Sequence, residues 1–273
     1  MFLGYSKNSD SVYTFRVGVV IRVWVQQPDK ANMNARRKIA SELSGYVRRI
    51  GLDYLNISPH GPVAARDPPE CAKIRHHVVI SGTGRAGTSF LVQLLTHLAQ
   101  DTGYQPNTLE LYPEAKAGLE FDVRDPGAPY IVKSPWLCDY IDEILANPLL
   151  RIDHAILPVR DFVAAAASRA HVQQYTTGSQ DGDMRVAGGL WHTNKATEQA
   201  VVLRLQFTKL IEVLARHDVP TTLLWYPRIV RDPDYLYKKL AFLLGGRDFV
   251  SFRTIFKRVV HPDWVHQFTP IDR

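Results

Sequence analysis

Apolar and amphipathic stretches alternate along the second part of the chain, and this alternation predicts the fold. Four short apolar runs have the length and composition of buried β-strands: residues 76–81, 129–133, 155–159 and 221–226. Four longer stretches have apolar residues at helical spacing: residues 88–100, 136–147, 162–170 and 194–217. The first of these helices is expected to end before a left-handed cap at Gly103. A further helix is expected from Pro233, with Asp232 as its N-cap and Gly245–Gly246 as its end.

Strands that are apolar throughout and separated by helices predict a parallel sheet with helices on both faces. Because crossover connections are right-handed, these elements give a three-layer α/β/α domain, which we assign to residues 74–273. Such domains bind ligands at the carboxyl ends of their strands. Chemically distinctive residues at those ends are therefore the candidates for function.

Residues 1–73 have a different pattern, and we interpret them as an N-terminal extension and linker. A β-like run at residues 17–25 is short and interrupted by Arg22, so it is not a membrane-spanning segment. Residues 31–52 have apolar side chains at helical spacing, and a proline-rich stretch follows them. The chain start also lacks the basic, apolar and small-residue regions of a secretory signal.

Composition narrows the class of protein. The 273 residues are 45% hydrophobic, enough for a large core and a domain of enzyme size. The 33 Lys and Arg residues exceed the 27 Asp and Glu residues, which suits anionic ligands, but no long basic run predicts a nucleic-acid partner. Two cysteines, Cys71 and Cys138, are too few for a disulfide framework and are not spaced as metal ligands. We therefore expect a cytoplasmic protein without a metal cofactor.

The strongest chemical signal is "SGTGRAGTSF" at residues 81–90, between the first predicted strand and helix. Its three glycines permit a tight turn and close backbone approach, and the free N–H groups of the following helix favour an anion. The sequence G-T-G-R-A-G satisfies the dinucleotide fingerprint of an NAD(P)-type Rossmann oxidoreductase. The acidic residue expected roughly 20 positions later would be Glu110, whose surroundings lack the pattern of a strand.

The same residues also fit the phosphate loop of P-loop nucleotide triphosphatases, from Gly82 to Ser89. Thr88, however, stands where these proteins have the lysine that neutralises the β- and γ-phosphates. A P-loop kinase, or a nucleotide-binding module without catalysis, is therefore an alternative rather than the preferred interpretation.

With Arg85 as its cation, "GRAGTS" resembles the [KR]-S-G-T-[TS] phosphosulfate-binding loop of the sulfotransferase superfamily. The resemblance implies a P-loop NTPase-like fold and the donor 3′-phosphoadenosine 5′-phosphosulfate. It also implies that the loop holds the 5′-phosphosulfate through these residues: Thr83, Gly84, Arg85, Ala86, Gly87, Thr88 and Ser89. The alternative is a tight turn whose arginine faces solvent.

A second segment, "PVRDFVAAAASRA", places Arg160 at the end of a predicted strand and Ser168 eight residues later on a helix. It resembles the segment with which sulfotransferases bind the 3′-phosphate of the donor. A guanidinium and a hydroxyl suit a dianionic phosphate because they form charge-assisted hydrogen bonds. The alternative is that Arg160 pairs with Asp161 and that Ser168 keeps one helix face small.

A third segment, "YIVKSPWL", places Lys133 at the end of another predicted strand. It resembles the strand end from which a sulfotransferase lysine approaches the sulfuryl group or the leaving phosphate; alternatively, Lys133 only extends to solvent from a buried strand. The resemblance covers residues 76–260 in the order of strands and helices. It departs from the cytosolic members at Pro135, where they have a histidine, and in lacking their glycine- and lysine-bearing adenine loop. These departures indicate a bacterial-type or divergent member.

The implied reaction is transfer of a sulfuryl group to a hydroxyl or amine of a small-molecule, saccharide or lipid acceptor. It would pass through a loose, in-line transition state in which charge builds on the leaving phosphate, by analogy with phosphoryl transfer. We assign Arg85 and Lys133 to that charge and Glu120 to the acceptor's proton. The other candidate bases are His171, His192, Glu110 and Glu114. Residues 182–194, rich in glycine, are expected to form a mobile flap over the acceptor or to be pinned to the core by Trp191.

Overall fold

The computed structural model describes residues 12–17, 19–24 and 73–265. The chain divides into two compact units, Met1–Arg66 and Asp67–Arg273. In the first unit, β1 (Val12–Val17) pairs with β2 (Val19–Trp24) as an antiparallel two-stranded sheet. The strand predicted at residues 17–25 corresponds to β2, whereas the helix predicted at residues 31–52 lies outside the described residues.

The second unit contains a four-stranded sheet whose strands are all parallel. Its strands are β3 (Arg75–Ile80), β4 (Ile131–Lys133), β5 (Leu150–Val159) and β6 (Thr221–Trp225). They lie in the order β4-β3-β5-β6, so β3 has a partner on each side. The predicted α/β fold with a parallel sheet is confirmed. The third strand starts five residues earlier than predicted, because Leu150 already pairs with Arg75 at the start of β3.

Six α-helices are described in this unit. They are α2 (Thr88–His97), α3 (Leu137–Ala146), α4 (Phe162–Thr177), α5 (Gln199–Arg216), α6 (Pro233–Leu240) and α7 (Phe249–Val259). Short 3-10 turns accompany them: η1 (Ala196–Glu198), η2 (Arg228–Val230), η3 (Ala241–Leu243) and η4 (Pro262–Trp264). None of the described helices is long and apolar enough to cross a membrane.

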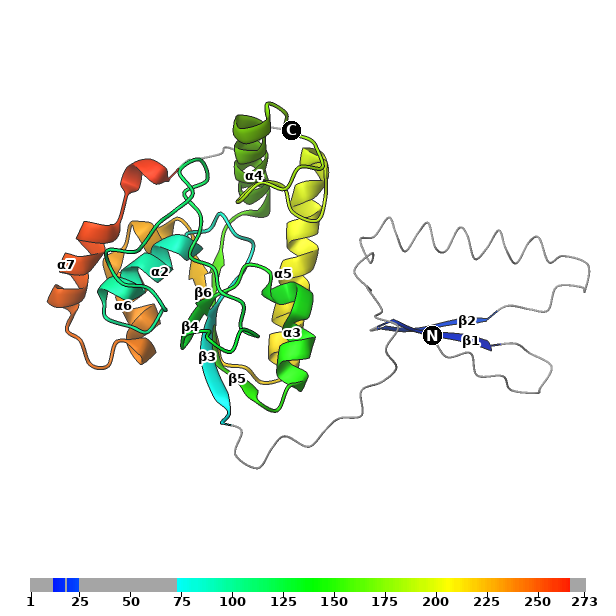
Figure 1. Ribbon diagram of the computed structural model, residues 1–273, viewed down its shortest axis with the longest axis horizontal. Coiled ribbons are helices and arrows are strands. Elements are labelled where there is room, and N and C mark those ends of the chain that lie inside the picture. The colour runs from blue at the N-terminus through cyan, green and yellow to red at the C-terminus, as the bar shows by residue number, and fades with distance from the viewer. Residues whose placement is uncertain (1–11, 18, 25–72, 266–273) are drawn as a thin grey trace, which may run out of the picture. The chain divides into compact units, whose positions relative to one another are not determined.

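The helices cover both faces of the sheet, as Figure 1 shows. Alternate residues of β3 point to opposite sides: Val78 and Ile80 pack with α2, α6 and α7, whereas Val79 packs with α3 and α5. His77 follows the same alternation and is buried, while its neighbour His76 is exposed. The core is therefore two apolar layers, one on each side of the sheet.

Some helix ends lie where the local sequence predicts them, and others do not. The Asp232 side chain caps α6 by accepting a hydrogen bond from the Tyr235 N–H group, as predicted. Helix α2, by contrast, ends at His97, and the left-handed residue that follows its C-cap Leu98 is Ala99, with a φ of 58°; Gly103 is also left-handed, with a φ of 76°, but lies further along the chain. The hydroxyls of Thr96 and Thr102, 2.6 Å apart, join this early end to the chain that follows.

The strand order brings three predicted segments to one edge of the sheet. The glycine-rich turn follows β3, Lys133 ends β4, and Arg160 follows β5. Because β4 and β5 are the two neighbours of β3, Lys133 and Arg160 lie on either side of the turn. The carboxyl ends of three adjacent strands therefore carry these three segments.

Candidate functional site

The glycine-rich turn, residues 81–87, is held in a conformation that requires its glycines. Gly82, Gly84 and Gly87 have φ values of 128°, 64° and 83°, in the region that residues with a Cβ rarely adopt. A Cβ on Gly82 would lie 2.9 Å from the Pro158 carbonyl oxygen. Gly87 is the N-cap of α2, and no side chain of a described residue caps the helix, so its first N–H groups can bind a ligand.

Arg85 directs its side chain from the turn to α4. Its Nε donates to Ser168 Oγ at 3.1 Å, and its Nη1 donates to the Ala115 carbonyl. The side chain is largely buried, and burial together with the nearby Arg160 lowers the pKa of Arg85 to about 10. Its Nη2 donates to no described residue. Arg85 and Ser168, which the sequence assigns to opposite ends of the donor, are thus in direct contact.

Arg160 supports the turn from the end of β5. Its Nη1 donates to the Arg85 carbonyl oxygen at 2.8 Å, and its guanidinium carbon lies 4.9 Å from the centre of the Tyr226 ring. Asp161, the residue that we considered as its ion-pair partner, accepts a hydrogen bond from the Ala164 N–H group and caps α4. Burial lowers the pKa of Arg160 as well.

Arg169 is a third buried arginine at this place, and the sequence analysis did not identify it. It is 6% exposed, and its nitrogens donate to the carbonyls of Thr83 and Gly189 at 2.7 to 3.3 Å. Burial, with a further contribution from Arg85, lowers its pKa to about 9. Its sequence context, an alanine-rich helix, resembles an ordinary packing face. We call Arg85, Arg160 and Arg169 the arginine cluster.

Lys133 lies on the other side of the turn, close to the start of α2. Its Nζ donates to Ser89 Oγ at 2.8 Å, the Gly118 carbonyl at 2.6 Å and Glu120 Oε1 at 2.8 Å. The lysine is 3% exposed, so its ammonium group stays inside the protein instead of reaching solvent. Burial lowers the pKa of Lys133, and the negative charge of Glu120 acts in the opposite direction.

Glu120 is the predicted base that the structure places next to another site residue. Its side chain keeps 22% exposure, and its Oε2 accepts no hydrogen bond from a described residue. Burial and the Glu120 charge raise the pKa of the neighbouring Tyr104. The remaining candidate bases lie elsewhere: Glu110, Glu114 and His171 are exposed, and His192 contacts Asp139 at 3.0 Å.

The other predicted binding residues that have side chains, Thr83 and Ala86 in the turn and Thr88 and Ser89 at the start of α2, are buried. Thr83 Oγ1 donates to the Gly84 carbonyl at 3.0 Å, and Ser89 Oγ lies 3.3 Å from the Gly118 carbonyl. Ala86 and Thr88 are 0% and 6% exposed. At the start of the turn, Ser81 Oγ is buried without a hydrogen-bond partner among the described residues.

The segment of residues 182–194 is pinned to the core. Gln173 and Gln199, both 0% exposed, hold its backbone. Gln199 accepts from the Trp191 N–H group at 2.6 Å and donates to the Trp191 carbonyl at 3.1 Å. Gln173 accepts from the Leu190 N–H group at 3.3 Å and donates to the Met184 carbonyl at 2.9 Å. Of the two expectations for this segment, the contacts favour the pinned one.

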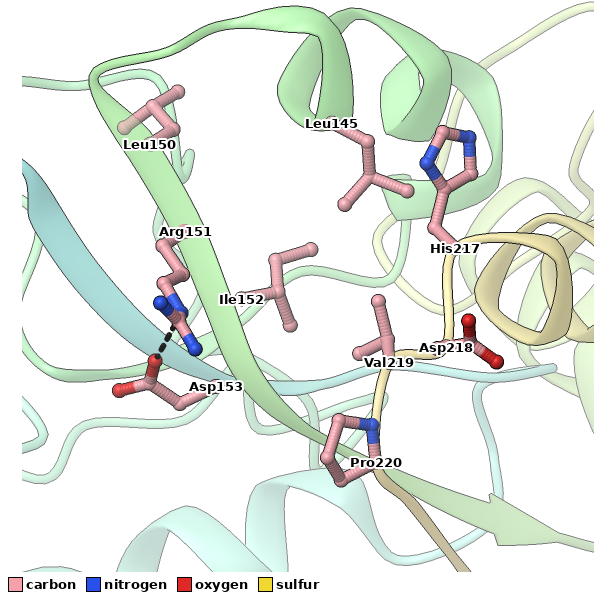
Figure 2. A pocket seen from close by; sticks show the side chains of 9 residues that line it. All are labelled: Leu145, Leu150, Arg151, Ile152, Asp153, His217, Asp218, Val219 and Pro220. Carbon is pink, nitrogen blue, oxygen red and sulfur yellow. Dashed lines mark ion pairs between the residues drawn. The ribbon is translucent and has the colours of Figure 1, made fainter.

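A separate pocket lies at the start of β5, the opposite end of that strand from Arg160. Figure 2 shows the side chains that line it. It is open and is formed by the start of β5, residues 150–153, and the turn before β6, residues 217–220. Leu145, Ile152 and Val219 line it, and Arg151 and Asp153 form an ion pair of 3.4 Å at one side. None of the predicted site residues lines this pocket. The described residues also contain no group of three or more His, Cys, Asp or Glu side chains that could hold a metal ion.

Comparisons with known proteins add no assignment, because the chain matches no family model, no curated protein and no solved structure.

Proposed function

We propose that this protein is a P-loop NTPase-like sulfotransferase, which moves a sulfuryl group from 3′-phosphoadenosine 5′-phosphosulfate to a hydroxyl or amine acceptor. One observation carries the proposal. The largely buried Arg85 of the glycine-rich turn and the buried Arg160, Arg169 and Lys133 come together at the carboxyl ends of adjacent strands. Among the described residues, Arg85 and Arg169 donate hydrogen bonds only to uncharged oxygen atoms.

Charge is the reason why this arrangement favours an anionic ligand. Burying an ion without a counterion costs several kcal/mol even after the protein relaxes. The lowered pKa values of Arg85 and Arg169 reflect that cost. A ligand with several negative charges would offset it, and the proposed donor carries such charges at both ends. The open N–H groups at the start of α2 add a favourable dipole for the same ligand.

The cations fall into two groups, which we match to the two ends of the donor. Arg85 lies against Ser168, so the pair suits the 3′-phosphate. Lys133 lies at the first turn of α2, so it suits the 5′-phosphosulfate together with Thr88 and the loop N–H groups. This assignment moves Arg85 away from the sulfuryl end, where the sequence resemblance places it.

In the proposed reaction the acceptor oxygen or nitrogen forms a bond to sulfur while the bond from sulfur to the bridging oxygen breaks. The bridging electron pair leaves with the 5′-phosphate of 3′-phosphoadenosine 5′-phosphate, where Lys133 and the loop N–H groups meet the developing charge. The acceptor's proton passes to Glu120, whose Oε2 is open. Acceptors of this kind include saccharides, lipids, peptides and small alcohols.

The strand order gives no support to the oxidoreductase alternative. In the dinucleotide-binding order 3-2-1-4-5-6, the strand before the glycine-rich turn lies between the second and fourth strands. Here β3 lies between β4 and β5, the next two strands along the chain. Glu110, the acidic residue that this alternative needs, is exposed and lies outside the sheet.

The test is thermal unfolding of the full chain with 3′-phosphoadenosine 5′-phosphate, NADH and ATP in parallel. A ligand that binds only the native state at 100 times its Kd stabilises it by about 2.7 kcal/mol. We expect the first nucleotide to raise the midpoint most. Stabilisation by NADH alone contradicts the proposal. Transfer is then measured with sulfur-labelled donor and a panel of saccharide, lipid and alcohol acceptors, and nucleotide binding without transfer would favour the nucleotide-binding module instead.

A further inference from the structure

Arg169, on α4, binds the backbone of the glycine-rich turn through its side chain. Its Nε and Nη2 both donate to the Thr83 carbonyl oxygen, at 3.3 and 2.9 Å. A guanidinium presents its N–H donors in a rigid planar fork, so two bonds to one oxygen fix the direction of that carbonyl. A third bond, from Nη1 to the Gly189 carbonyl at 2.7 Å, anchors the guanidinium to the 182–194 segment.

The direction of a carbonyl also fixes the N–H group of the same peptide. A trans peptide is planar, and its N–H points opposite to its C=O. With the Thr83 carbonyl turned to Arg169, the Gly84 N–H faces away from that arginine. Arg160 acts in the same way two residues later, because its bond to the Arg85 carbonyl turns the Ala86 N–H away from it.

Both of these N–H groups are left open. Neither the Gly84 nor the Ala86 N–H donates to an acceptor among the described residues. Left-handed residues in such a turn bring successive N–H groups into a concave site for an anion. Gly84 and Arg85 have φ values of 64° and 53°, which places the left-handed residues at this point of the turn. The turn therefore presents two N–H donors, and an arginine binds the carbonyl oxygen of each of the two peptides to which they belong.

We propose that Arg169 is a positioning residue, which acts on a bound anion through the Thr83–Gly84 peptide. The proposal rests on the function proposed above only in that the turn binds an anion. Gly84 fits this role, because a Cβ there would lie 2.5 Å from Arg169 Nη2. An alanine at residue 84 must displace the guanidinium or distort the turn, so it perturbs the same contact from the other side.

Amide NMR of the full chain tests the role directly. Titration of the wild type with 3′-phosphoadenosine 5′-phosphate, or with inorganic pyrophosphate, is expected to shift the amide signals of Gly84 and Ala86. In Arg169→Gln the Gly84 response is lost while the Ala86 response persists. The matched variant Arg160→Gln shows the reverse, since it releases the other carbonyl. A general loss of packing would change both signals together, so the selective pattern separates positioning from a structural role.

Affinity provides the second readout. We expect Arg169→Gln and Gly84→Ala each to raise the Kd for the anion about tenfold, which corresponds to loss of one charge-assisted contact. The double variant is expected to bind about as well as either single variant, because both changes break one contact. If Arg169→Gln does not fold, the Kd is measured with Gly84→Ala and Arg169→Lys instead. The lysine keeps the positive charge but lacks the planar guanidinium.

The outcomes separate the two proposals. Binding of pyrophosphate but not of the nucleotide defeats the sulfotransferase proposal, and the variants still decide the role of Arg169 with pyrophosphate. Unchanged affinity and amide shifts in Arg169→Gln overturn that role, even if the wild type binds the nucleotide. A wild type that binds neither anion overturns both.

Discussion

At the residue scale, the position of Arg85 has the largest consequence. Its guanidinium lies on Ser168 and beside Arg160, and Gly188 approaches it so closely that a Cβ there would lie 3.3 Å from Nη1. A charged group enclosed in this way has little freedom to follow a ligand. We therefore expect it to define one fixed anion position, which the 3′-phosphate of the donor would occupy.

Replacing Arg85 by alanine should weaken binding of 3′-phosphoadenosine 5′-phosphate by about 10- to 100-fold, the range for loss of hydrogen bonds to a charged group. Binding of adenosine 5′-phosphate, which has no 3′-phosphate, should change much less. Isothermal titration calorimetry with both nucleotides measures the difference. Arg228→Ala is the control, because Arg228 is exposed and pairs with Asp232. Equal losses for both nucleotides would place Arg85 at the 5′ end instead.

Motifs made it possible to predict some residues of the candidate site but not others. Arg85, Lys133 and Ser168 stand in short patterns with a defined chemistry, and the structure brings them to one edge of the sheet. Arg169 stands in no such pattern, since its partners Thr83 and Gly189 are 86 and 20 residues away. The direction of the Arg85 side chain could not be predicted from the sequence either, because it depends on the contact with Ser168 on α4.

At the element scale, buried amide side chains decide the conformation of the 182–194 segment. A glycine-rich, polar stretch predicts mobility, yet Gln173 and Gln199 bond its backbone from inside the protein. Local composition shows the glycines but not the partners that use them. A Cβ on Gly189 would lie 2.5 Å from Gln173 Oε1, so this glycine allows a close approach of the two segments.

Gly189→Ala should therefore destabilise the protein by about 1–3 kcal/mol, the usual cost of overpacking a filled interior. Chemical denaturation monitored by circular dichroism gives the free energy of unfolding. The matched control is Gly127→Ala, because a Cβ at Gly127 would make only an ordinary contact of 3.5 Å, with Asp125 Oδ1. Equal stability of the two variants would show that the segment yields to the added methyl group, and it would revive the flap interpretation.

At the scale of the whole molecule, the second unit contains every described core cluster. The alternation of apolar and amphipathic stretches was sufficient to predict its parallel sheet, because β3 and β4 are buried on both faces, although the edge strand β6 is buried only at Leu224. Strand order was not predicted, since periodicity records which residues are buried but not which strands are neighbours. That order is what puts Lys133 and Arg160 on the two sides of the turn.

A chain of residues 67–273 should consequently fold without the first unit. We expect its circular dichroism spectrum to show the helices of the second unit, and its cooperative unfolding transition to match one transition of the full chain. Nucleotide-induced stabilisation should also be retained, because every candidate site residue lies in this unit. A fragment that remains unfolded would show that the first unit contributes to the stability of the second.

The hydrogen bonds from Arg160 and Arg169 to the turn affect when, during synthesis and folding, the turn can acquire its final conformation. During synthesis the turn is made long before α4, which carries Arg169, one of the two arginines that bind the backbone of the turn. A nascent chain that ends before residue 160 has the glycines and hydroxyls of the motif, but it lacks both arginine side chains that bind the Thr83–Gly84 and Arg85–Ala86 peptides. The capacity to bind would thus arise late and abruptly, so that ligand capture marks completion of the domain.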